Sequence, residues 1–445
     1  MANPLPSLSI APLPTLGFWA ATAIVVASMV GTGVFTSLGF QVAGMPSIFP
    51  LLLLWIVGGV VALCGALCYG ELAAAMPRSG GEYHYLSVIY HPAIGFLSGW
   101  ASATVGFAAP VALAALALGE YVQRIYPSAS VRGLALIVVL VLALIHSRSV
   151  RLGGRVQVVL TTLKVGAVLL LIGAAFWSGT AVVLPATGTA PIPGDWALIT
   201  GPSFAVSLVY VSYAYSGWNA AAYVTSEIRD PQRTLPRVLL VGTLLVAALY
   251  VGLNYAFLRV TPLAELNGQL EIGLLAAQRL FPAPLARLMA LTIAALLTST
   301  ISAMTFAGPR IVQAIGEDVP ALRFLAFRQP GSGVPLRALG FQTLLTLGFV
   351  VSGSFRQVMV YAGFILSLFT FLTVAGVLVL RQQRPELPRP YRTWGYPLTP
   401  LLFLLLNGWT LWFLIRQQPY ESLAGLATLL VGLPLYYLLT RRATA

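Results

Sequence analysis

The sequence predicts an all-α integral membrane protein with about twelve transmembrane helices. Hydrophobic residues make up 58% of the 445 residues and charged residues only 8%, whereas a soluble domain is usually less than half apolar. The apolar runs are about 20 residues long and carry few charges, which fits helices rather than the shorter alternating strands of a barrel. Two runs are interrupted at comparable places, as in folds built from inverted repeats.

The runs follow one another along the chain and are separated by clusters of Arg, Pro and Gly. The expected spans are residues 15–43, 47–75, 93–123, 130–147, 153–177, 200–226, 237–259, 284–313, 336–353, 356–380, 397–416 and 421–440. We expect one transmembrane domain over residues 1–445, with a first repeat at about 15–180, a second at about 198–381 and two additional helices at about 397–440. Each repeat has an odd number of spans, so the second must be inverted.

The two longest connections, residues 178–199 and 260–283, are both expected outside the cell. Pro, Gly and Thr dominate the first, which is typical of a loop. Residues 263–281 in the second are expected to form a short interfacial helix.

The charge distribution indicates how the chain is oriented in its membrane. The net charge is +13, but the arginines follow the loops instead of forming one patch, so nucleic acid is not expected as a partner. With the N-terminus in the cytoplasm, 17 arginines fall inside and 7 outside. This bias predicts a multi-pass protein of the cell inner (plasma) membrane with both termini cytoplasmic.

The single lysine of the chain, Lys164, lies in an uncharged stretch from Val156 to Phe176. At 1.5 Å per residue it lies about 13 Å from Arg155 along the helix, inside a hydrocarbon layer roughly 30 Å thick. A charge at this depth must face a protein interior or a wet cavity and meet carbonyls, hydroxyls or a carboxylate. We interpret Lys164 as a functional residue; the alternative is a lysine locked structurally between helices.

The first span is interrupted at Gly31, Thr32 and Gly33. Glycine lets the backbone leave the helix without steric penalty and frees amides and carbonyls at mid-membrane depth. The N-terminus of the half-helix starting near Gly33 would offer N–H groups to a carboxylate, and the carbonyls of Met29 and Val30 would accept from an ammonium. The alternative is that the small residues only allow two membrane helices to pack closely.

The sixth span is interrupted at Ser216 and Gly217, where the carbonyls of Tyr213 and Ala214 would face an amino group. Together the two breaks match a zwitterion, and such paired breaks indicate a transporter with its site at the midplane. Tyr213 is placed to close over the ligand, so we interpret it as a gate, with packing as the alternative.

The eighth span carries clustered hydroxyls, of which Ser299, Thr300 and Ser302 are candidates to accept from the Lys164 ammonium. The alternative for each is a hydrogen bond to its own helix backbone. Glu71 and Glu227 lie near cytoplasmic ends of spans, so we interpret them as structural or gating groups.

Other classes of function find little support in the residues. The histidines lie near span ends and form no ligand constellation, and Cys64 and Cys68 lie four apart in the second span as small apolar residues, so no metal, cofactor or disulfide is predicted. A membrane enzyme would need a nucleophile, a metal cluster or paired acids at membrane depth, and a channel would need a continuous polar path.

Several motifs, specific in combination, cover nearly the whole chain. They are Val30-Gly-Thr-Gly-Val-Phe35, Gly70-Glu71 with Pro77-Arg-Ser-Gly-Gly-Glu-Tyr-His-Tyr85, Tyr213-Ala-Tyr-Ser-Gly-Trp-Asn219 leading to Glu227-Ile-Arg-Asp-Pro-Gln-Arg233, Val374-Ala-Gly-Val-Leu-Val-Leu-Arg381 and Pro385-Glu-Leu-Pro-Arg-Pro390. With these motifs the chain resembles permeases of the amino acid, polyamine and organocation (APC) superfamily, most closely the bacterial relatives of L-type amino acid transporters.

The resemblance implies two inverted five-helix repeats, with broken helices 1 and 6, followed by two further helices. It implies that Thr32 and Gly33 bind a substrate carboxylate and that Tyr213 is an aromatic gate. It also implies that Lys164 replaces a sodium ion and ties the first span to the eighth. The substrate amino group would be bound by the carbonyls of Met29, Tyr213, Ala214 and Ser216.

The resemblance further implies sodium-independent secondary transport of amino acids by alternating access, with either proton symport or amino acid exchange. Lys164 would lose and regain a proton under symport and would stay protonated as a strut under exchange. A modest apolar pocket, favouring small or medium neutral L-amino acids, is predicted from Ala109, Ala303, Met304 and Phe364. Cationic amino acids or polyamines are the alternative substrates. No outer-loop cysteine exists, so a disulfide-linked accessory subunit is not expected.

Overall fold

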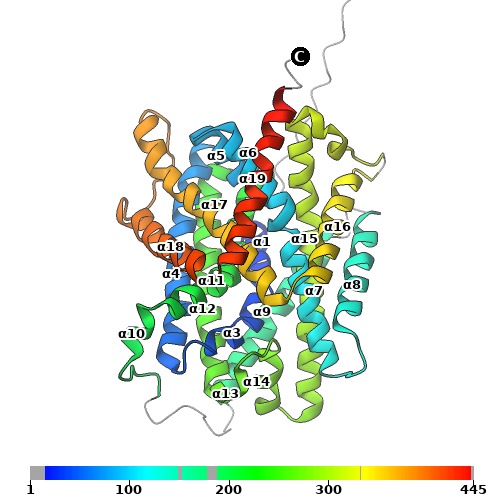
Figure 1. Cartoon of the computed structure of the whole chain (residues 1–445), viewed down its shortest axis with the longest axis vertical. Helices are drawn as coiled ribbons and strands as arrows, with labels where there is room; N and C mark the ends of the chain where they lie inside the picture. The colour runs from blue at the N-terminus through cyan, green and yellow to red at the C-terminus, as the bar shows by residue number, and fades with distance from the viewer. Residues whose placement is uncertain (1–15, 149–152, 178–187, 331, 442–445) are drawn as a thin grey trace, which may run out of the picture.

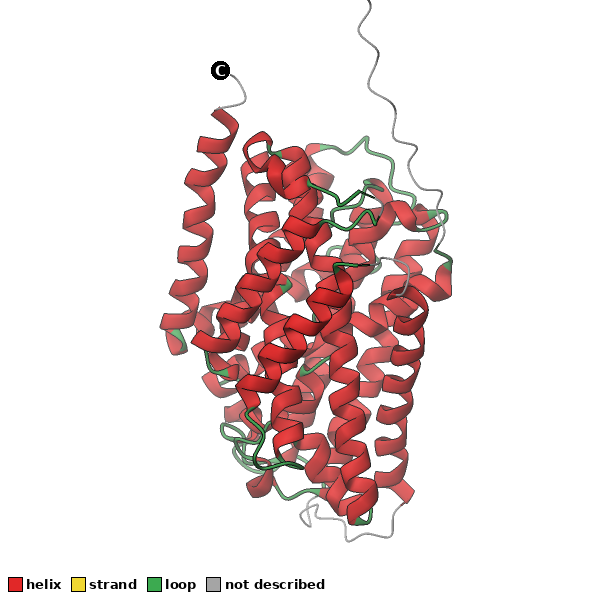
Figure 2. Cartoon of the chain, turned by 90° about the vertical axis from the view of Figure 1, so that its right-hand side faces the viewer, coloured by secondary structure: helices red, strands yellow, loops and turns green. Residues whose placement is uncertain are grey.

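The computed structural model describes residues 16–148, 153–177, 188–330 and 332–441, and within these ranges the chain is almost entirely helical and contains no β-strand (Figure 2). Most helices run along the long axis of the molecule (Figure 1). Their bounds are α1 Phe18–Met29, α2 Gly33–Thr36, α3 Leu38–Val42, α4 Ile48–Ala75, α5 Glu82–Ile89, α6 Pro92–Ala101, η1 Ser102–Gly106, α7 Ala108–Gln123, α8 Val131–His146, α9 Gly153–Trp177, α10 Asp195–Ile199, α11 Pro202–Tyr215, η2 Ala220–Glu227, α12 Pro231–Val260, α13 Leu263–Leu266, α14 Ile272–Leu280, α15 Ala283–Asp318, η3 Pro320–Ala326, α16 Leu336–Ser352, α17 Phe355–Gln383, α18 Leu398–Gln417 and α19 Pro419–Arg441.

The helices correspond to the predicted spans one by one. Eight stretches are long and apolar enough to cross a membrane, namely α1 with α2, α6 with η1 and α7, and α4, α12, α15, α17, α18 and α19. Three shorter apolar helices are Val131–His146, Thr161–Trp177 and Leu336–Ser352. With α11, which ends at the predicted break of the sixth span, they confirm the predicted all-α membrane fold.

The two C-terminal helices lie at the periphery of the bundle. The most apolar windows of α18 and α19 are only 28% and 17% buried, against 56% or more for the other long spans. They pack mainly on α17, α11, α4 and α6. Inside the bundle, α4 packs against α12, α7 packs against α15, and α1 contacts both α12 and α9. The centre is therefore built by helices of the two predicted repeats.

Residues 263–281, which were expected to form a short interfacial helix, form two helices, α13 and α14. They pack on α3, α2 and α15. Leu266 and Ile272 are fully buried, because apolar surface here has a protein neighbour available to cover it. The backbone N–H of Gly268 donates to the Gly39 carbonyl at 3.0 Å. The segment thus covers the end of the broken first span, at the end of the molecule opposite α5 (Figure 1).

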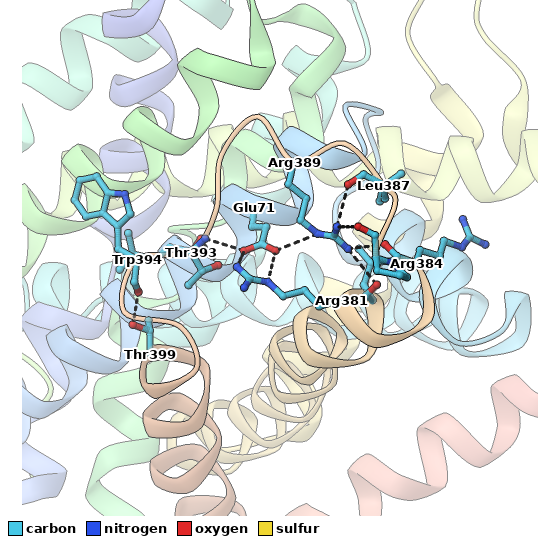
Figure 3. Close-up of polar contacts among 11 residues, drawn as sticks. Glu71, Arg381, Arg384, Leu387, Arg389, Thr393, Trp394 and Thr399 are labelled. Atoms are coloured by element: carbon cyan, nitrogen blue, oxygen red, sulfur yellow. Dashed lines mark hydrogen bonds and ion pairs between the residues drawn. The ribbon is translucent and has the colours of Figure 1, made fainter.

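Glu71 joins α4 to α17 and to the connection that follows α17 (Figure 3). Its carboxylate accepts two hydrogen bonds from Arg381, at 2.8 and 2.7 Å, and one from the backbone N–H of Thr393 at 2.7 Å. On the other side, Nε of Arg389 lies 3.5 Å from Oε1 of Glu71. These contacts fit the structural role, one of the two interpretations given for Glu71, whereas the side chain of Glu227 lies outside the described residues.

Candidate functional site

The breaks in the first and sixth spans touch each other, and each requires a glycine. Helix α1 ends at Met29 and α2 begins at Gly33, where a Cβ atom would lie only 2.5 Å from Cα of Ala214. Gly217 has φ +98°, and a Cβ there would lie 2.8 Å from the Ser28 carbonyl oxygen. A side chain at either position would separate the two breaks or strain the backbone. Glycine at both positions thus allows the two interruptions to pack directly against each other.

Beyond each break the chain takes a different course. After the first, α2 continues into α3 through Ser37, whose backbone is also helical, so a half-helix of more than two turns starts at Gly33. After the second, Ser216 is extended with ψ 151°, and the chain resumes as the 3₁₀ turns of η2. The Ser216 hydroxyl donates to the Tyr213 carbonyl at 2.7 Å and stabilises this turn.

Lys164 of α9 reaches the first break and the eighth span at the same time. Its ammonium donates to the Val30 carbonyl at 3.0 Å and to the Thr300 hydroxyl at 2.7 Å. The residue is only 1% exposed. A charge buried this deeply is tolerated because such oxygen atoms replace water around it. The cation therefore bridges α15 and the carbonyl end of α1.

Of the three candidate hydroxyls on the eighth span, only Thr300 meets the lysine. The expectation for Ser302 is wrong, because its hydroxyl lies 2.8 Å from Nε2 of His146 instead. The Ser299 hydroxyl is buried and has no hydrogen-bond partner among the described residues. Positions two apart on an α-helix point about 200° apart, so Thr300 and Ser302 must face different neighbours.

A residue that the sequence did not single out, Tyr250 of α12, links the two breaks. Its hydroxyl lies 2.5 Å from the Met29 carbonyl and 3.1 Å from the Ala214 carbonyl. A hydroxyl has one hydrogen, so the two carbonyls share one donor. Trp55 and Tyr215 pack against its ring, and Tyr250 is fully buried. The only signal in the sequence is a tyrosine within an apolar span, which is not specific.

A large cavity of about 2160 Å³ opens at the breaks. Of the nine residues predicted to bind substrate, Val30 alone does not line it. Tyr213 does, and its side chain interacts with that of Thr32 across the two breaks. From there the cavity extends to the arginine-rich end of the molecule, where Arg148, Arg310 and Arg328 line it.

The predicted pocket composition is half right. Ala303 and Met304 line the cavity, but Ala109 and Phe364 do not; both are buried against other helices. Their place is taken by residues that the sequence did not mark, including Phe107 next to the π-helical turn η1. The remaining lining side chains include polar groups that were not predicted as site residues, namely Glu82, His146, Asn219, Gln313, Ser367, Thr370 and Asn407.

The side chains that could hold a metal do not come together. Within the described ranges there is no group of three or more His, Cys, Asp and Glu residues suited to a metal ion. Cys64 and Cys68 are free and buried in α4. The arrangement of the site is that of a binding cavity: two backbone breaks, a fixed cation behind one of them and a wide opening on one side.

Comparison with known proteins gives one consistent result. Residues 16–432 match the amino acid permease family. The chain is 31% identical over 439 residues to the large neutral amino acids transporter small subunit 2 of Mus musculus, covering 95% of this chain and 80% of that protein. It is 29% identical over 434 residues to the b(0,+)-type amino acid transporter 1 of Homo sapiens, covering 95% and 87%. It is 28% identical over 432 residues to the Asc-type amino acid transporter 1 of Mus musculus, covering 95% and 80%.

Proposed function

Because the chain belongs to the amino acid permease family, whose members are transporters and not enzymes, we propose that it is a sodium-independent secondary transporter of small or medium neutral L-amino acids. The observation that carries this proposal is the Lys164 ammonium, held between the Val30 carbonyl and the Thr300 hydroxyl. A fixed cation at this point does what a bound sodium ion would do, since it neutralises the oxygen atoms of two helices that must stay together.

The substrate binds as a zwitterion between the two breaks. Its carboxylate meets the start of the half-helix at Gly31, Thr32 and Gly33, where backbone N–H groups and the helix dipole favour an anion. Its ammonium meets the carbonyls at the ends of α1 and α11. The bonds from Tyr250 to the Met29 and Ala214 carbonyls support this arrangement, because a carbonyl with one hydrogen bond keeps a second lone pair for the ligand.

Transport proceeds by alternating access. The cavity reaches Arg148, Arg310 and Arg328, whereas α13 and α14 cover the opposite end. The arginine bias places the arginine-rich end in the cytoplasm, together with both termini, so this conformation is open to the inside of a cell inner (plasma) membrane. Closure of this path and release of α13 and α14 would give the outward-open state. Lys164 either exchanges a proton in each cycle, giving symport, or remains a strut, giving amino acid exchange.

The transporter works without a disulfide-linked partner. One relative is named a small subunit, which implies a further subunit for that protein. In this chain, however, the two cysteines lie in α4 and are buried, so neither offers an exposed thiol for a bridge.

Replacing Tyr250 with phenylalanine should lower kcat/KM for uptake about five- to thirtyfold. The change removes the donor shared by the Met29 and Ala214 carbonyls without altering ring packing, and a lost buried hydrogen bond costs about 1–2 kcal/mol. Initial uptake rates in sodium-free proteoliposomes measure the effect. Tyr255→Phe on the same helix is the control, since Tyr255 stacks on Phe176 away from the breaks. Equal rates for both variants would remove Tyr250 from the site.

Neutral amino acids should compete best for the cavity. Ala303 and Met304 give the wall near the breaks an apolar character, which offers no partner for a charged side chain. Inhibition of labelled alanine uptake by unlabelled alanine, serine and leucine is expected to be at least about tenfold stronger than by arginine or putrescine, a difference of about 1.4 kcal/mol. Stronger inhibition by arginine would favour a cationic substrate, the class that the sequence analysis left as the alternative.

A further inference from the structure

The segment between α4 and α5 places the carboxylate of Glu82 in the protein interior. Gly80 and Gly81 have φ +124° and +52°, and a Cβ at Gly81 would lie 2.7 Å from the ring of Tyr223. Glycine at these two positions allows the chain to turn closely enough for Glu82 to point inward at the start of α5. Glu82 is only 3% exposed, yet it lines the cavity that holds the proposed substrate site.

Glu82 is connected directly to the broken sixth span. Its Oε1 accepts from the Tyr69 hydroxyl at 2.5 Å and from Nδ2 of Asn219 at 3.1 Å. Asn219 is two residues beyond Gly217, immediately before η2. Tyr69 packs edge-on against Trp218 at 4.6 Å between ring centroids. The Glu82 carboxylate therefore links α4 to the chain that follows the break of the sixth span, on the cytoplasmic side of the substrate site.

Among the residues that the structure describes, Glu82 forms no ion pair. On α17, Arg381 is bound to Glu71, and on α15, Asp318 accepts from the Tyr83 hydroxyl at 2.7 Å. Helix α6 carries no ionisable residue. The ionisable side chains that interact electrostatically with Glu82 come from α4, α5 and η2 and include Tyr69, Tyr85 and Tyr223.

Burial without a cation favours the protonated acid. It raises the pKa of Glu82 to about 7, and the hydrogen bonds from Tyr69 and Asn219 partly oppose this rise. The carboxyl is therefore poised to gain or lose a proton at physiological pH, and the cavity gives it a path to cytoplasmic water.

We propose that Glu82 is a proton-exchanging residue of the transport cycle, and that its charge sets how firmly Asn219 holds the broken sixth span in the inward-open arrangement. The inference rests on the proposed function. When ionised, Glu82 accepts charge-assisted hydrogen bonds, which are roughly twice as strong as neutral ones. When it takes a proton from cytoplasmic water, both bonds weaken and η2 is released to move with the gate. Lys164 acts on the first span, and Glu82 acts on the sixth.

The test is the pH dependence of substrate counterflow, with equal pH and equal amino acid on both sides of sodium-free proteoliposomes. We expect the wild-type rate to change through about pH 7, and Glu82→Gln to lose that change. Glu82→Asp should retain it. Tyr69→Phe should move the midpoint to higher pH, because it removes a donor to the charged form. Glu386→Gln, on the exposed connection after α17, is the control and should match wild type.

Each outcome separates this inference from the proposed function. Absence of amino acid counterflow in the wild type at every pH would reject the transport proposal itself. An active Glu82→Gln variant with the wild-type profile would reject only the role of Glu82. If Glu82→Gln is inactive, the Tyr69→Phe variant decides. A pH profile of Tyr69→Phe with the same midpoint as wild type would then reject the role of Glu82. Infrared spectra provide the direct check: the carboxylic-acid band that grows on acidification through pH 7 should be missing in Glu82→Gln.

Discussion

Replacing Lys164 with alanine is expected to reduce amino acid transport at least about a hundredfold, which corresponds to about 2.7 kcal/mol. The variant removes the ammonium that holds the Val30 carbonyl and the Thr300 hydroxyl at 3.0 and 2.7 Å. Both oxygen atoms then remain in a buried site without their donor, and α1 loses its link to α15. Exchange of labelled substrate into sodium-free proteoliposomes measures the loss.

Two variants on the eighth span are matched controls for this result. Thr300→Val removes one partner of the lysine and should slow transport by a smaller factor, about tenfold or less. Thr298→Val should leave the rate within about twofold of wild type, since Thr298 donates to the Ala294 carbonyl of its own helix. If Lys164→Ala folds normally and transports as fast as Thr298→Val, the lysine is a structural residue without a role in the cycle.

Replacing Glu71 with alanine should destabilise the protein by about 3–5 kcal/mol, the usual result of removing one partner from a buried ion pair. The side chain of Glu71 is 2% exposed, and those of Arg381 and Arg389 are 21% and 7% exposed. The variant leaves the guanidinium groups of Arg381 and Arg389 without the carboxylate that both contact, and it frees the Thr393 N–H. We expect a markedly lower apparent melting temperature in detergent, with loss of the contact between α4 and the connection after α17.

The control for this variant is Glu386→Ala on the same connection, at an exposed position, where surface substitutions usually stay within about 0.5 kcal/mol. A double variant, Glu71→Ala with Arg381→Met, should recover part of the stability, because it also removes one of the uncompensated charges. Equal melting temperatures for Glu71→Ala and wild type would show that the network in Figure 3 contributes little to the folded state.

The parts of the site that were predictable from sequence are those with an unusual residue for their surroundings. Glycines inside an apolar span mark a break because they permit an unusual backbone, as at Gly217, or a close approach of two chains, as at Gly33. Lys164 stands out because a lone charge in a membrane span is costly. The structure brings Gly33 against Ala214 and Lys164 against Thr300. Both pairs join residues that the sequence had already singled out.

The parts that were missed depend on which helices cross. Tyr250 bridges the two breaks only because α12 passes both of them, and no local pattern marks one tyrosine in an apolar helix. Glu82 lay in a recognised motif, but its burial became visible only with Tyr69 and Asn219 around it. The error at Ser302 has a simpler origin: helical geometry alone places it on a different face from Thr300.

The replacement of sodium by Lys164 can be measured as uptake of labelled neutral amino acids into proteoliposomes. Wild type and Lys164→Ala are compared with and without sodium, with an imposed pH gradient and with or without internal amino acid. We expect equal wild-type uptake in both media and at least about a hundredfold less uptake by Lys164→Ala. Accumulation into empty vesicles identifies symport, and uptake only against internal amino acid identifies exchange. Wild-type uptake that requires sodium, or that is absent for every amino acid, would show that Lys164 does not have this role.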